Sequence, residues 1–107
     1  MNREERIGLN EAVFREVNER IENLAETFDL EHLDLVCECG NGDCLERISM
    51  SRSEYEQLRS DPQLFAVYPG HEATDVELLV EKRGGYHIVR KNTGAPEEIA
   101  EQTDPRG

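Results

Sequence analysis

The sequence contains no tryptophan and only three phenylalanines and three tyrosines. Apolar residues make up 36% of its 107 positions, and charged residues make up 34%. A chain of this length buries only about two thirds of the surface that its unfolded form exposes. We therefore expect a single domain with a thin hydrophobic core, to whose stability a bound metal ion would contribute.

Basic residues are also scarce. Twelve Lys and Arg stand against 24 Asp and Glu, which gives a formal net charge of −12. Proteins that bind nucleic acid contact its phosphates through Lys and Arg, and the field of an acidic surface repels polyanions. The composition therefore argues against a nucleic-acid partner.

Long apolar runs are absent as well. The polar start Met1–Arg6 is not followed by the apolar core of an export signal, and no run approaches the length that spans a membrane. We therefore expect a cytoplasmic protein without a membrane partner.

Cysteine occurs only three times, and an odd number in a reducing compartment disfavours a framework of disulfides. Cys37, Cys39 and Cys44 lie within eight consecutive positions, in a turn rich in Gly, Asn and Asp. Two cysteines at i and i+2 of an extended strand point the same way, so both can face one ion. Three cysteines with one histidine form a common structural zinc site. The C-x-C-x4-C spacing therefore predicts a structural zinc loop that takes a histidine from elsewhere.

The preferred fourth ligand is His71, because the tight turn Pro69-Gly70-His71-Glu72 at the end of a predicted strand can aim its side chain. His32, five residues before Cys37, is an alternative, and His87 on a predicted strand is a weaker one. Zinc and iron both accept four sulfur and nitrogen ligands in a tetrahedron, so the identity of the metal stays open.

Two resemblances accompany this loop. Cys37-Glu38-Cys39-Gly40-Asn41-Gly42-Asp43-Cys44-Leu45-Glu46-Arg47-Ile48 resembles the post-SET zinc motif of some protein lysine methyltransferases. That resemblance implies a way of holding zinc but no methyl transfer, since nothing in the chain matches the SET-domain motifs. Most of the chain is also similar to a group of small uncharacterised bacterial proteins, mostly actinobacterial, which implies a shared fold and metal loop. The residues that carry this second resemblance are the N-terminal helix, the Cys-x-Cys loop, Tyr55, Arg59, Phe65, Pro69–Glu72 and Thr103–Arg106.

Residues 9–28 have the pattern of an amphipathic helix, with Asn10 as a plausible N-cap. Its apolar residues follow the spacing of a coiled-coil seam, namely Ile7, Phe14, Val17, Ile21, Leu24 and Phe28. The stripe can pack on the domain's own sheet, or it can bind a partner protein, including a second copy of the chain. Both interpretations remain open.

The remaining patterns predict an α+β fold with a four- to five-stranded antiparallel sheet and a zinc-stapled hairpin loop. Alternating residues around 33–37 and 45–50 predict two strands joined by the metal loop. Ser51-Arg52-Ser53-Glu54 is a capping box that starts a short middle helix. Further strands are predicted at 65–68, 76–82 and 86–91. We expect one domain over residues 9–91, a flexible segment 1–8, and an acidic tail 92–107 that is mobile or forms one helical turn.

No pairing of a nucleophile with a base can be identified, so we predict no catalytic residues. The favoured function is that of a small structural-zinc protein acting as a protein-binding or regulatory module. The alternative is a redox- or metal-responsive switch, in which oxidation of Cys37 and Cys39 releases the metal. A small zinc hydrolase with Glu72 as general base is less favoured, because three thiolates make the metal a poor Lewis acid.

Overall fold

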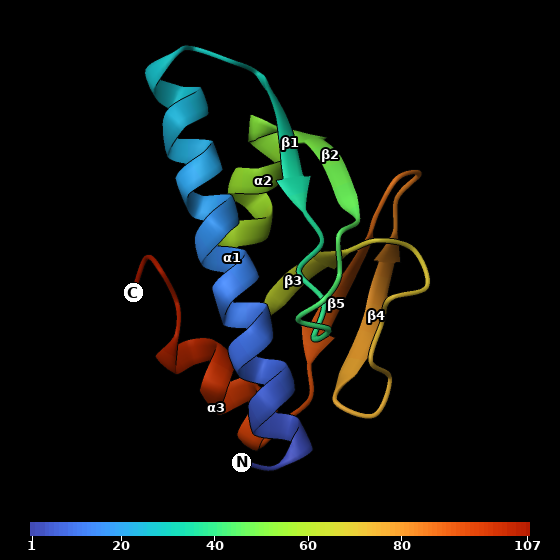
Figure 1. Ribbon diagram of the computed structural model, residues 1–107. Helices are drawn as coiled ribbons and strands as arrows, with labels where there is room; N and C mark the ends of the chain where they lie inside the picture. The colour runs from blue at the N-terminus through green and yellow to red at the C-terminus, as the bar shows by residue number, and fades with distance from the viewer.

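The computed structural model describes all 107 residues, which form three helices and five strands. Figure 1 shows α1 along one side of the molecule, α3 beside its N-terminal half, and the strands on the other side. The α+β class is therefore confirmed. The elements in chain order are α1 (Arg3–Thr27), β1 (His32–Val36), β2 (Arg47–Ser51), α2 (Arg52–Arg59), β3 (Leu64–Val67), β4 (Glu77–Lys82), β5 (His87–Lys91) and α3 (Ala95–Gln102).

The strands form two antiparallel sheets, β1–β2 and β3–β5–β4, in place of the single sheet that the sequence predicted. The pairing of β1 with β2 ends at Val36 and Arg47, where the chain turns away into the cysteine-rich loop. Just beyond this point, the backbone N–H of Glu38 donates to the carbonyl of Ala66 in β3 at 2.9 Å. The departure of the loop from the ladder therefore separates the two sheets, and this bond keeps them adjacent.

Helix α1 begins at Arg3, six residues before the predicted start. The side chain of Asn2 accepts a hydrogen bond from the backbone N–H of Glu5 at 2.8 Å and so caps the helix. Gly8 does not end the helix but brings it close to α3, since a Cβ there would lie 2.8 Å from Cγ2 of Ile99. The helix therefore includes most of residues 1–8, the segment that was expected to be flexible.

The C-terminal segment also contains more structure than predicted. It forms the two-turn helix α3, with Pro96 in its first turn, and this helix packs against α1. Pro96 and Ala100 are its buried residues. An apolar face this short does not stand out among acidic neighbours in the sequence, which is why at most one helical turn was expected there.

The side of α1 that faces the domain is largely polar. Its buried residues are Ile7, Gly8, Glu11, Arg15, Asn18, Glu22 and Ala25. Of the six residues of the expected seam, Ile7 is buried and Ile21 packs against the core, whereas Val17, Leu24 and Phe28 are exposed, so only part of the stripe packs on the domain. The polar groups can be buried because distant residues pair with them. For example, Lys91 donates to Glu11 at 2.7 Å, and Arg15 donates to the carbonyls of Pro62 and Ala100 at 2.6 and 2.8 Å.

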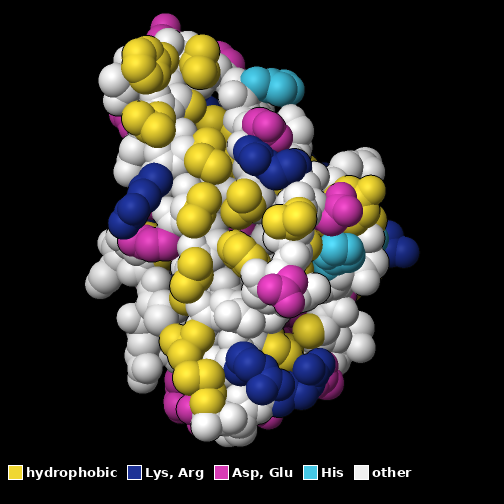
Figure 2. All heavy atoms as spheres, viewed as in Figure 1, with side chains coloured by type: hydrophobic (Ala, Val, Ile, Leu, Met, Phe, Trp, Pro, Cys, Tyr) yellow, Lys and Arg dark blue, Asp and Glu magenta, His cyan; other side chains and the backbone are white.

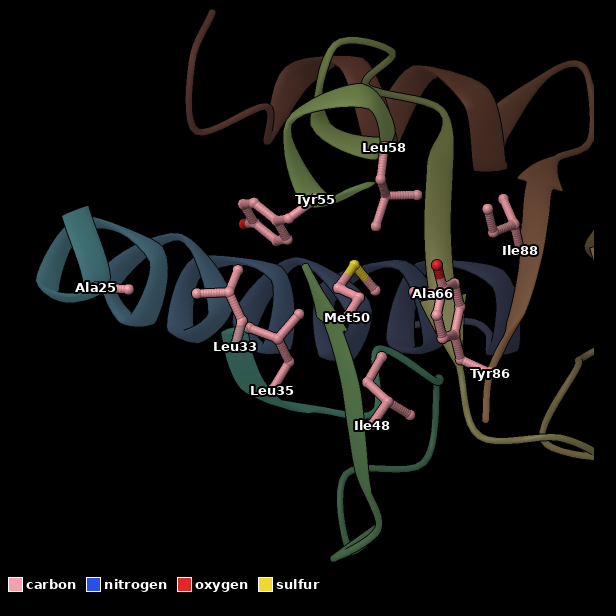
Figure 3. Close-up of a cluster of buried hydrophobic side chains, with 10 residues drawn as sticks. All are labelled: Ala25, Leu33, Leu35, Ile48, Met50, Tyr55, Leu58, Ala66, Tyr86 and Ile88. Carbon is pink, nitrogen blue, oxygen red and sulfur yellow. The ribbon is translucent and has the colours of Figure 1, made fainter. Parts of the chain in front are cut away.

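The main hydrophobic core lies between the β1–β2 hairpin, α2 and the inner face of the second sheet. Figure 3 shows its ten buried members, which are Ala25, Leu33, Leu35, Ile48, Met50, Tyr55, Leu58, Ala66, Tyr86 and Ile88. A smaller cluster contains Cys37, Cys39, Phe65, Val67, Val89 and Ala100. Two of the three cysteines are thus part of the packed interior. None of the helices combines the length and the apolar composition that crossing a lipid bilayer requires.

Candidate metal centre

The structure brings together the four residues that the sequence analysis selected. Cys37, Cys39 and Cys44 come from the loop between β1 and β2, and His71 comes from the loop between β3 and β4. One ligand atom from each residue lies within 4.8 Å of all the others. His32 is exposed at the start of β1 and His87 lies on β5, so neither belongs to this group. The four residues could therefore hold a metal ion.

The distances between the ligand atoms suit a small metal ion with tetrahedral coordination. Nδ1 of His71 lies 3.5 Å from Sγ of Cys44 and 3.7 Å from Sγ of Cys37. With Zn–S bonds of about 2.3 Å and Zn–N bonds of about 2.0 Å, tetrahedral geometry places a sulfur and a nitrogen ligand about 3.5 Å apart. The imidazole presents Nδ1 to the cluster and thereby leaves Nε2 free.

Glu38 anchors the Cys-x-Cys segment on the side opposite the ligand cluster. Because side chains alternate along an extended chain, the residue between the two cysteines points away from the ligand cluster. Its carboxylate is fully buried and accepts hydrogen bonds from both terminal nitrogens of Arg59, at 2.7 and 3.1 Å. It also accepts from Nδ2 of Asn18 at 2.7 Å and from the backbone N–H of Ala66 at 3.1 Å. These bonds fix the backbone that carries Cys37 and Cys39.

Arg59 is the last residue of α2 and is as buried as its partner Glu38. Burial alone lowers the pKa of this guanidinium, but the contact with the Glu38 carboxylate outweighs burial, and the net pKa is raised. The Arg59 guanidinium therefore stays protonated. The sequence analysis missed its role, although one signal was present: an acidic residue at the central position of Cys-x-Cys must point away from the metal.

The far side of the loop is attached to α1. Gly40 lies so close to the helix that a Cβ there would stand 2.5 Å from Cγ2 of Ile7. Its carbonyl accepts a hydrogen bond from Nδ2 of Asn10 at 2.8 Å, so the side chain of Asn10 holds the loop. The prediction that Asn10 is the N-cap of the helix was wrong, since Asn2 is the N-cap. The backbone N–H of Cys44 donates to the carbonyl of Asn41 at 3.0 Å, in the turn that returns Cys44 to the cluster.

A tight turn places His71. Its N–H donates to the carbonyl of Tyr68 at 2.9 Å, with Pro69 and Gly70 at the two central positions. Gly70 has φ of 92°, which suits the third position of a type II turn and favours glycine. The backbone N–H of Tyr68 donates to Sγ of Cys37 at 3.1 Å, and such a bond stabilises a thiolate. One turn therefore supplies both the imidazole and a donor to a sulfur.

The three thiols influence one another because they lie so close together. The hydrogen bond from Cys37 lowers the pKa of Cys39 to about 5, whereas the same contact and burial raise the pKa of Cys37. Burial also raises the pKa of Cys44. Three thiolates side by side therefore require a compensating positive charge, which a metal ion bound among the sulfurs would supply.

Glu72 is adjacent to His71 in sequence, but its carboxylate pairs with Nδ1 of His87 on β5. Burial would raise the pKa of Glu72, but the hydrogen bond from His87 holds it below its usual value. Glu72 therefore pairs with His87 and not with the ring of its neighbour His71. A hollow of about 350 Å³ adjoins the cluster, and its lining includes Cys39, His71 and Glu72.

Comparisons of this chain with family models, with curated proteins and with solved structures find no match.

Proposed function

We propose that Cys37, Cys39, Cys44 and His71 bind one zinc ion in a structural role, and that the chain acts as a small module that binds another protein. The observation that carries the proposal is the convergence of four donor atoms within 4.8 Å from two loops that are distant in sequence. Sulfur and nitrogen donors in a tetrahedron are the ligands of structural zinc sites.

A structural role is supported better than a hydrolytic one. Four protein donors fill the coordination sphere of zinc, whereas catalytic zinc keeps one position for water. The carboxylate that a hydrolase would use as a general base, Glu72, is paired with His87. The proposed ion would connect the loop of one sheet to the loop of the other. Structural zinc in small sites binds with about 10–16 kcal/mol of apparent free energy, which is comparable to the whole stability of a domain.

Metal analysis of the purified chain and two histidine variants tests this proposal. We expect one zinc per chain in the wild type and in His32→Ala, and a loss of affinity of at least about tenfold in His71→Ala. Cobalt substitution provides a second measurement, because a tetrahedral site of three sulfurs and one nitrogen gives strong visible bands that His71→Ala alters. Unchanged stoichiometry, affinity and spectrum in His71→Ala would show that this histidine is not the fourth ligand. Iron in place of zinc would refute the identity of the metal.

The second candidate, a thiol switch, is favoured by the accessibility of one side of the cluster. Cys44 and His71 are only half-buried, and the adjoining hollow reaches Cys39. Two thiolates would give two electrons to hydrogen peroxide and form one disulfide, the peroxide would take up two protons from solvent and leave as two waters, and zinc would be released. Zinc release at one peroxide per chain, reversed by a thiol reductant, supports the switch. Retention of zinc under these conditions supports an inert structural site.

A further inference from the structure

The outward face of α1 carries an apolar stripe that no other part of the chain covers. Because the buried face of this helix is mostly polar, five of its large hydrophobic residues are exposed to solvent. Figure 2 shows hydrophobic side chains gathered along the length of the helix. The stripe consists of Leu9, Val13, Val17, Leu24 and Phe28, which are 39% to 68% exposed.

The stripe is long enough to form an interface. A helix of 25 residues extends for about 37 Å, close to the 40 Å length of the molecule. A hollow of about 300 Å³ beside the C-terminal part of the helix widens the apolar surface, and its lining includes Leu24, Phe28 and Leu30. Monomeric proteins rarely leave so extended an apolar patch uncovered, which indicates a protein partner.

The order of residues along the stripe identifies that partner as a second copy of the chain. The stripe is symmetric about the point between residues 18 and 19: Leu9 and Phe28 are equally distant from this point, and so are Val13 and Leu24, while Val17 has Arg20 as its counterpart. In a two-fold interface, residue i of one copy contacts residue j of the other, and j contacts i. A symmetric stripe is therefore complementary to itself when two copies pair antiparallel.

Charged residues near the middle of the stripe also favour antiparallel pairing of the two helices. Glu16 is exposed at the edge of the stripe, and Arg20, one helical turn later, is exposed within the stripe. Antiparallel pairing about the same centre places Arg20 of one copy beside Glu16 of the second copy. Parallel pairing would place Arg20 opposite Arg20, and like charges at this distance repel. We propose that two copies of the chain dimerise through the outward faces of α1, antiparallel and centred between residues 18 and 19.

This inference rests on the proposed function in one respect: it names the protein that the module binds as a second copy of the chain. Sedimentation equilibrium of the full metal-loaded chain tests it, and the zinc content of the same samples tests the metal site separately. We expect a wild-type dimer. Val13→Asp and Leu24→Asp should each raise the dissociation constant by about 30-fold, as expected of central interface residues. The control Leu78→Asp changes an exposed apolar residue of β4 and should leave the dimer intact.

A charge exchange tests the direction. Arg20→Glu should weaken the dimer, because the introduced carboxylate would then face Glu16 of the second copy, and the double variant Glu16→Arg/Arg20→Glu should restore it. A wild type that is monomeric at every concentration overturns the proposal, whether or not zinc is bound. Equal weakening by Leu78→Asp overturns the assignment to α1, and failure of the double variant to restore the dimer overturns the antiparallel pairing.

Discussion

Glu38 shows how one buried side chain can hold the backbone that carries the candidate ligands Cys37 and Cys39. Its buried carboxylate accepts four hydrogen bonds, two of them from Arg59. Removing two charges from water is costly, and only a fully bonded pair offsets that cost. The loss of Arg59 would therefore leave an unpaired buried charge on the residue that lies between Cys37 and Cys39 in sequence.

Arg59→Met should destabilise the fold by about 3–5 kcal/mol, because it leaves the Glu38 carboxylate buried without its counter-charge. It should also weaken zinc binding, since the backbone of Cys37 and Cys39 loses its anchor. Urea unfolding and a zinc competition assay measure the two effects. The matched control is Arg83→Met, whose ion pairs with Glu54 and Glu81 are partly exposed to solvent and therefore contribute little to stability. Equal effects of the two substitutions would contradict the anchoring role.

At the scale of elements, α1 explains both the success and the failure of the sequence-based prediction. The 3.6-residue pattern identified the helix correctly, but it could not tell which face turns inward. The buried position of Arg15 depends on carbonyls of Pro62 and Ala100, and that of Glu11 depends on Lys91. Such partners lie 47 to 85 residues away in sequence, so no local pattern indicates them.

Glu22, on the inward face of α1, should make stability depend on pH. Burial, followed by the neighbouring Glu56, raises its pKa from 4.5 to about 7. Between these two values the folded chain holds a proton that the unfolded chain has released, so the free energy of unfolding falls as the pH rises. Above pH 7 the folded state bears the whole penalty, up to about 3 kcal/mol for a shift of this size.

Glu22→Gln removes this penalty, since a neutral amide needs no proton. We expect the variant to match the wild type near pH 4 and to be more stable at pH 8, by up to about 3 kcal/mol. Unfolding in urea at a series of pH values gives the comparison. Glu26→Gln, an exposed position on the same helix, is the control and should change little. A Glu22→Gln variant that is less stable than the wild type at pH 8 would show that the carboxylate is held by favourable contacts.

For the whole molecule, patterns confined to one segment predicted more than pairings between segments. The capping box at Ser51 and Glu54 is confirmed, and so are five antiparallel strands and the hairpin of β4 with β5. The proximity of His71 to the cysteines could also be predicted from local features. Three cysteines lack the fourth ligand of a zinc site, and the tight turn at Pro69–Glu72 can aim a histidine side chain. The division into two sheets could not be predicted, because it depends on where the metal loop leaves the β1–β2 ladder.

That division gives metal removal a specific consequence. The ion that we propose would join the loop between β1 and β2 to the turn at Tyr68–His71, and thus one sheet to the other. The free energy of binding expected for such a site rivals the stability of a small domain, so a chain with a thin core should not keep its fold without it. A chelator should therefore lower the melting temperature sharply and abolish amide-exchange protection in both sheets, and added zinc should restore both. Chelator saturated with zinc beforehand is the control, and a zinc-free chain that melts like the untreated protein would mean that the packing of α1 against both sheets is sufficient by itself.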